Sequence, residues 1–136
     1  MCIRDSLKLI NETPDCLFIS IHQNSYPYPN NTGTQVFYSP NHPESQALAA
    51  AIQQSVIHLI QPQNTRKVKK SGTEIYLLYQ AKTPAVMVEC GFMSNAQETE
   101  KLRTEAYQNE LALSIFYGVL SYLNGIGTAD ATPAAQ

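Results

Sequence analysis

The sequence predicts an α/β domain: a twisted, mostly parallel β-sheet flanked by helices. Two observations predict it. Short apolar runs of strand length alternate along the chain with amphipathic segments of helical period. The 136 residues suit one domain, and 43% hydrophobic and 15% charged residues are typical of a globular protein. No apolar run is long enough to span a membrane.

The first part of the chain predicts a helix followed by two strands. Residues 5–11 fit a short helix. Residues 16–21, CLFISI, are continuously apolar and β-branched or aromatic, which favours a buried strand ending at His22. Residues 26–33 are rich in turn-forming residues, and residues 35–38 fit another strand.

A longer helix of about 17 residues is predicted next, because apolar residues recur at helical spacing until Pro62. Asn41 is placed to cap this helix, and Glu44, three residues on, completes a capping box. Residues 63–73 are polar and predict a loop, and residues 75–79, IYLLY, predict a strand.

The last part predicts a buried strand at residues 85–90, ending near Glu89, and then two helices. Ser94 or Asn95 caps the first of these, at 96–104. The second, at 106–123, has apolar residues on most faces and is expected to be largely buried. We therefore expect one domain over residues 1–123 and a disordered tail over residues 124–136.

His22 and Glu89 are the candidate functional residues, because each falls where a predicted strand ends and ligands bind α/β sheets at that edge. An imidazole there suits a metal ligand, an acid or a base, or else a structural histidine. A carboxylate inside a buried strand is rare unless it is paired or functional, so Glu89 is either a general base or ion-paired. A zinc hydrolase needs three ligands and a nearby carboxylate, so these two cannot hold zinc alone.

The other polar candidates have weaker positions. His42 and His58 do not follow strands, and Cys90 should face away from Glu89 and pack as a small hydrophobe. The aromatic loop with Tyr26 and Tyr28 either binds substrate or packs locally.

The charge pattern argues against a nucleic-acid ligand. The net charge is −2, which does not favour phosphate neutralisation. Residues 66–70, RKVKK, are either a solvated connection or a contact for an anionic polymer.

Two motifs in order resemble the zinc N-acetylmuramoyl-L-alanine amidases of the amidase-3 family. Residues 18–25, FISIHQNS, resemble its SIHxN motif, and residues 84–95, PAVMVECGFMSN, resemble its P-x-x-x-x-E-x-G-F-x-S-N motif. Residues 33–38, GTQVFY, resemble its G-x-x-x-F-Y strand. The resemblance covers residues 4–123 and is nearest to the CwlD-like amidases of spore-forming bacteria.

The resemblance implies that the substrate is peptidoglycan, cleaved between N-acetylmuramic acid and L-alanine. His22 would be one zinc ligand and Glu89 the catalytic acid/base. The family's other two ligands, a histidine in a GHGG motif and a glutamate, have no counterpart here. We therefore expect an N-terminally truncated chain that lacks the first strands of its sheet and is itself inactive. The family acts outside the cytoplasm, although no signal segment is visible in this sequence; nothing in it indicates an oligomeric state.

Three alternatives remain open. The chain could recognise cell-wall glycopeptide without cutting it. It could belong to another metallohydrolase on a similar sheet, such as a carboxypeptidase acting on stem peptides. It could also be a non-enzymatic interaction domain in which Glu89 is only ion-paired.

Overall fold

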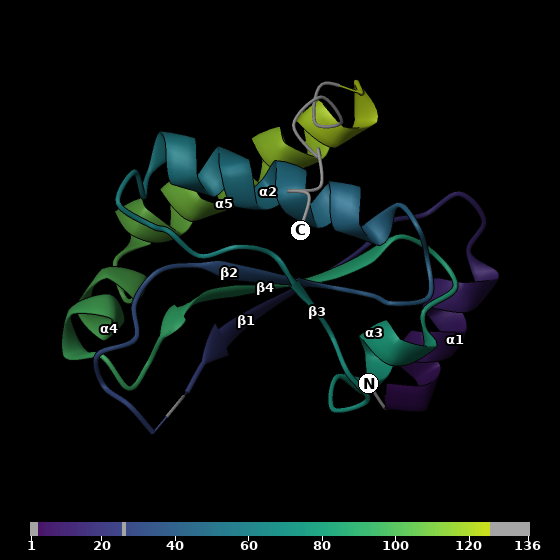
Figure 1. Cartoon of the computed structure of the whole chain (residues 1–136), viewed down its shortest axis with the longest axis horizontal. Helices are drawn as coiled ribbons and strands as arrows, with labels where there is room; N and C mark the ends of the chain where they lie inside the picture. Colours follow the sequence, from purple (N-terminus) through teal and green to yellow (C-terminus); the bar gives the residue numbers. More distant parts are fainter. Residues whose placement is uncertain (1–2, 26, 126–136) are drawn as a thin grey trace, which may run out of the picture.

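A four-stranded sheet forms the centre of the molecule (Figure 1). This computed structural model describes residues 3–25 and 27–125. The strand order is β1-β4-β2-β3; β4 runs parallel to β1 and antiparallel to β2, and β2 runs parallel to β3. The strands are β1 (Phe18–Asn24), β2 (Gln35–Tyr38), β3 (Lys69–Lys70) and β4 (Ala85–Phe92). The predicted α/β class is confirmed, with two parallel pairings and one antiparallel pairing.

Helices cover both faces of the sheet. In Figure 1, α2 and α5 lie above the sheet, α1 and α3 lie below its right-hand part, and α4 lies at the left. The helices are α1 (Ile3–Glu12), α2 (Ser45–Leu59), α3 (Tyr76–Gln80), α4 (Ala96–Leu102) and α5 (Glu105–Leu123). None of these helices in the described part of the chain is long and apolar enough to cross a membrane.

The central strand β4 is buried along its whole length and divides the core in two. Val86, Val88 and Cys90 face the cluster beneath α2 and α5. Ala85 and Met87 face a smaller cluster beneath α1 and α3. Side chains alternate along a strand, so Glu89 points to the same face of the sheet as Ala85 and Met87. It lies two residues beyond Met87, towards the carboxyl end of β4.

The strand predicted at residues 75–79 is wrong, because residues 76–80 form the short helix α3. Only Leu78 of this segment is fully buried, whereas Tyr76 and Tyr79 are exposed. Periodicity alone cannot separate a short buried strand from a helical turn. Ser39 and Asn11 donate hydrogen bonds to the Leu78 and Gln80 carbonyls at 2.7 and 3.2 Å, which satisfies orphan groups at the end of α3.

The predicted cap of α2 is also wrong. The residue before α2 is Glu44, which makes no side-chain cap hydrogen bond, and α2 begins at Ser45. The Asn41 side-chain amide instead donates to the Tyr79 carbonyl. The later cap is confirmed: Asn95 Oδ1 accepts from the Gln97 and Glu98 amides at 3.0 and 3.1 Å.

Helix α5 is less buried than predicted. Leu111 and Ile115 are buried against the core, but Leu113, Phe116 and Tyr117 are about half exposed. Helix α5 packs on α2 along one side, so apolar residues on its other side stay exposed. Apolar character alone therefore does not show that a residue is buried. In addition, the predicted loop at residues 63–73 contains the two-residue strand β3. Most of the predicted tail lies outside the described residues, which end at Gly125.

Candidate functional site

His22 and Glu89 lie next to each other on neighbouring parallel strands. They are direct register partners in the pairing of β1 with β4. Both side chains therefore project from the same face of the sheet, the one opposite α2 and α5. The sequence predicts that each strand ends at or next to its candidate residue. In the structure, β1 continues to Asn24 and β4 to Phe92, so His22 and Glu89 lie just inside the strand ends.

Glu89 is a buried residue, and one of its carboxylate oxygens has no hydrogen-bond partner among the described residues. Its side chain is only 8% exposed, and Oε2 has no hydrogen-bond partner within the described part of the chain. Burial raises the pKa of Glu89 above its ordinary value, and the charge of His22 opposes this rise. Burying a carboxylate oxygen without a hydrogen-bond partner destabilises the folded state. Such a group in a native structure therefore indicates a functional role.

His22 is exposed and has a polar neighbour on its own strand. Its Nε2 lies 2.7 Å from the Ser20 hydroxyl, which projects from the same face two residues earlier. This contact orients the imidazole ring beside Glu89. Within residues 3–25 and 27–125, no group of three or more His, Cys, Asp and Glu residues could hold a metal ion.

A second buried carboxylate, Glu98 at the start of α4, ties together two segments that flank the pair. Its Oε2 accepts hydrogen bonds from the Gly33 amide at 3.0 Å and the Phe92 amide at 3.2 Å. Gly33 ends the loop that follows β1, and Phe92 ends β4. Gly91 makes this approach possible, because a Cβ atom there would lie 2.7 Å from Glu98 Oε2.

This role of Glu98 is not among the sequence predictions. Glu98 is the third residue after the cap Asn95, which is the position from which a capping-box glutamate folds back onto the cap amide. The glycine two residues after Glu89 was the available signal, because a strand glycine marks a close approach of another group.

The other candidates do not join the pair. His42 Nδ1 accepts from the Glu44 amide at 3.3 Å, and His58 Nδ1 lies 2.9 Å from the Gln54 carbonyl on the exposed side of α2. Cys90 points into the core beneath α2 and α5, as predicted. Tyr28 is 65% exposed, and Tyr26 lies outside the described residues.

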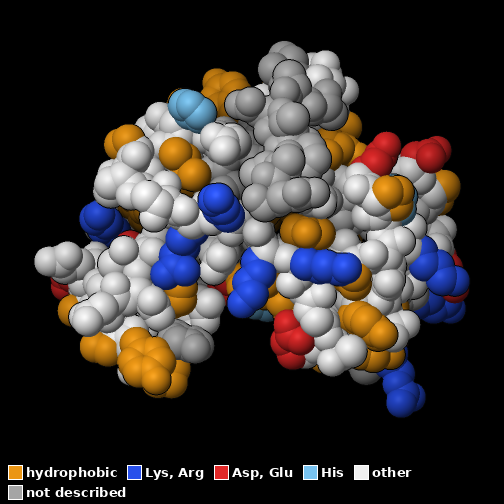
Figure 2. Space-filling model, viewed as in Figure 1, with side chains coloured by type: hydrophobic (Ala, Val, Ile, Leu, Met, Phe, Trp, Pro, Cys, Tyr) orange, Lys and Arg blue, Asp and Glu red, His pale blue; other side chains and the backbone are white. Residues whose placement is uncertain are grey.

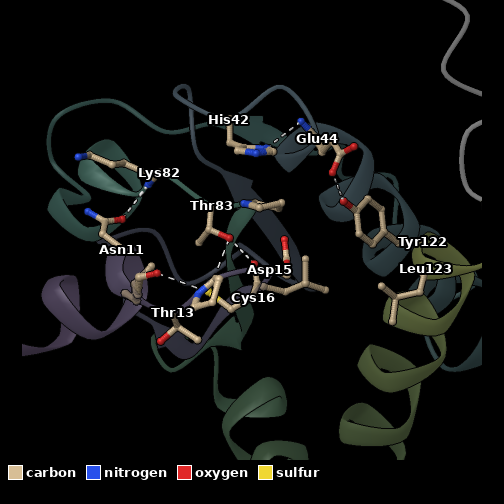
Figure 3. Close-up of a pocket in the computed structure, with 14 residues that line it drawn as sticks. Asn11, Thr13, Asp15, Cys16, His42, Glu44, Lys82, Thr83, Tyr122 and Leu123 are labelled. Carbon is tan, nitrogen blue, oxygen red and sulfur yellow. Dashed lines mark hydrogen bonds between the residues drawn. The ribbon is translucent and has the colours of Figure 1, made fainter.

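A cavity of about 450 Å³ lies at the opposite end of β1 and β4. Figure 3 shows Asp15, His42, Thr83 and Tyr122 around it, with the Tyr122 hydroxyl donating to Glu44 Oε2 at 2.7 Å. Its walls come from the segments that precede β1 and β4, from the segment that precedes α2 and from the end of α5. Ligands of α/β sheets bind beyond the carboxyl ends of strands, so His22 and Glu89 remain the better candidates.

The fold and the site define an α/β domain with a histidine and a buried carboxylate side by side near the carboxyl ends of two parallel strands. Residues 1–121 match the family model for N-acetylmuramoyl-L-alanine amidase, Amidase_3. The chain belongs to this family.

Individual relatives agree with this assignment. The germination-specific N-acetylmuramoyl-L-alanine amidase of Bacillus subtilis is 35% identical over 92% of this chain and 52% of its own length. The CwlD amidase of Clostridioides difficile, solved with the GerS lipoprotein, superposes with a TM-score of 0.85 at 32% identity, over 90% of this chain and 62% of that one. An N-acetylmuramoyl-L-alanine amidase of Clostridium difficile 630 gives a TM-score of 0.82 at 28% identity, over 91% and 66%. The chain thus spans about half to two-thirds of these relatives.

Proposed function

We propose that this chain forms part of an amidase that hydrolyses the bond between N-acetylmuramic acid and L-alanine in peptidoglycan. The observation that carries the proposal is the pairing of His22 with Glu89, a buried residue whose Oε2 has no hydrogen-bond partner among the described residues. Family membership gives this pairing its chemical context, because relatives that share the fold are named as amidases of this bond.

Glu89 acts as the general acid/base. Its raised pKa makes the carboxylate more basic than an exposed glutamate, so it can take a proton from the attacking water. The same group then returns a proton to the nitrogen of L-alanine as that amine leaves. The position of Glu89 in a fully buried strand keeps its backbone fixed during both transfers.

His22 is proposed as one zinc ligand, and the Ser20 hydroxyl orients its ring as outer-shell partners of ligating histidines do. A bound zinc ion supplies Lewis acidity that lowers the pKa of water and polarises the scissile carbonyl. The residues fit this group in part, since a ligand and a base stand side by side.

The remaining ligands are proposed to lie outside the described residues. The family resemblance implies a histidine and a glutamate in addition to His22. We therefore expect these 136 residues alone neither to bind zinc tightly nor to cleave peptidoglycan. The similarity to a germination-specific amidase supports a substrate in the spore wall, outside the cytoplasm.

Product analysis tests the activity. A complete amidase domain containing this chain is incubated with purified muropeptides, and the products are identified by mass spectrometry. The proposal predicts peptides with a free L-alanine amine and glycans with intact lactyl groups. Binding without cleavage would instead favour a recognition module, and cleavage within the stem peptide would favour a carboxypeptidase.

The chain alone provides a second test. We expect less than one equivalent of zinc after dialysis and no muropeptide cleavage. One retained equivalent of zinc together with cleavage would contradict the proposed location of the other ligands.

A further inference from the structure

A group of cations lies along the sheet beside the proposed site. Residues 66–70 contain four of the nine Lys and Arg residues of a chain whose net charge is −2. This segment runs next to β2: Lys69 is the register partner of Phe37, and the Gln35 side-chain amide donates to the Lys67 carbonyl at 3.0 Å.

The segment alternates between the two faces of the sheet. Val68 packs against the core beneath α2 and α5. Lys67 and Lys69 therefore point to the opposite face, and Lys69 Nζ indeed lies 5.8 Å from the centre of the Phe37 ring. That face is also the face of Glu89, whose register partner on β2 is Gln35.

Arg66 is held in place by uncharged groups. Its Nε donates to the Thr32 carbonyl at 2.6 Å, and Nη1 donates to Gln35 Oε1 at 3.2 Å. The guanidinium also stacks over the Phe92 ring at 4.5 Å from its centre, and Nη2 lies 3.5 Å from Asn31 Oδ1. None of these partners is a carboxylate, so the positive charge of Arg66 is positioned but not neutralised by them.

We call Arg66, Lys67 and Lys69 the basic strip: Lys67 and Lys69 point to the face of Glu89, and Arg66 lies at the end of the strip, over the ring of Phe92. Figure 2, viewed as Figure 1, shows Lys and Arg side chains gathered across the middle of the molecule, over β3 and at the upper end of a hollow in its lower part. Backbone hydrogen bonds at Glu74 and Gly72, and to a smaller extent the charge of Lys69, lower the pKa of Glu74, so Glu74 balances part of the charge of Lys69. The strip is therefore cationic at Arg66 and Lys67 and partly balanced at Lys69.

We propose that the basic strip is the anion-binding wall of the substrate groove and binds a carboxylate of the peptide part of the substrate. This inference rests on the proposed function. The peptide begins at the bond to be cut and carries its carboxylates further along, so a cationic wall beside Glu89 meets that part of the substrate. Fixed guanidinium and flexible ammonium groups both suit carboxylates.

Sedimentation with cell walls tests the strip on the chain itself. The walls are first stripped of phosphate-containing polymers, so that peptide carboxylates are their remaining anions. We expect the double variant Lys67→Glu/Lys69→Glu to bind about three- to tenfold more weakly than the unmodified chain at low salt. The matched control is Lys70→Glu/Lys82→Glu, which changes the net charge equally.

The control is informative because of where its residues lie. Lys70 follows Lys69 in β3 and points to the other face, and Lys82 lines the cavity at the far end of the strands. We expect its binding to stay within about twofold of the unmodified chain. Thermal melts of all variants confirm that each is folded.

Several outcomes overturn the proposal. Equal weakening by both double variants would mean that only net charge matters. If binding is unchanged after chemical amidation of the wall carboxylates, the strip does not bind those carboxylates. If binding requires the phosphate polymers, the strip binds phosphate instead. Failure of the proposed amidase activity is distinguishable, because this binding assay involves no hydrolysis.

Discussion

Replacing Glu98 with Ala should destabilise the domain by about 2–5 kcal/mol. The Glu98 carboxylate accepts hydrogen bonds from the Gly33 and Phe92 amides, and Glu98 is only 9% exposed. A buried N–H left without a partner costs about 1–3 kcal/mol; the Phe92 N–H is buried, whereas the Gly33 N–H is only partly buried and costs somewhat less. Glu98→Gln keeps an acceptor oxygen but loses its charge, so its cost should be smaller, about 1–2 kcal/mol.

Urea denaturation of the variants measures these costs. Glu100→Ala on the same helix is the control, because Glu100 is exposed and its loss should change the unfolding free energy by less than about 0.5 kcal/mol. Gly91→Ala adds a second test, since its Cβ would lie 2.7 Å from Glu98 Oε2. This clash disappears in Glu98→Ala, so the double variant should cost less than the sum of the single variants. Additive costs, or a Glu98→Ala cost equal to the control, would refute the role of Glu98.

Three further predictions concern packing and ionisation. Gly118→Ala should destabilise by about 1–3 kcal/mol or more, because its Cβ would lie 2.5 Å from a backbone atom of α2; an unchanged urea midpoint would contradict this close packing. Cys90 should resist alkylation at pH 8 while half-buried Cys16 reacts, because burial raises the pKa of Cys90 to about 11; mass spectrometry of the labelled peptides checks this. Burial, followed by the hydrogen bond and charge of Glu44, raises the pKa of Tyr122 from 10.0 to about 12. The unfolded chain loses this proton first, so stability falls as pH rises from 10.0 to about 12, and Glu44→Gln should lower the Tyr122 pKa in a tyrosinate absorbance titration. A Tyr122 pKa that does not move would show that Glu44 has no part in the shift.

The location of His22 and Glu89 at one edge of the sheet could be predicted, because it depends on strong local signals in the sequence. Each residue interrupts an apolar run of strand length, and polar residues at such positions share one edge of an α/β sheet. The structure turns this common edge into direct register between β1 and β4.

Other features depend on contacts between distant segments, so the sequence does not reveal them. Asn41 has the right spacing for a helix cap, but its amide donates to the Tyr79 carbonyl, which lies 38 residues away. Residues 76–80 form a helix in which only Leu78 is fully buried, in the cluster that includes Ile10 and Met87. The antiparallel pairing of β2 with β4 likewise brings Gln35 and the basic strip beside Glu89.

The most direct test of the proposed mechanism is the rate of muropeptide cleavage by the Glu89→Gln variant of a complete amidase domain containing this chain. If the Glu89 carboxylate transfers protons, kcat should fall about 10²–10⁴-fold, while zinc content and folding remain unchanged. Exposed Glu105→Gln removes a carboxylate in the same way and should leave kcat unchanged. A Glu89→Gln variant that cleaves muropeptides at the unmodified rate would contradict the account.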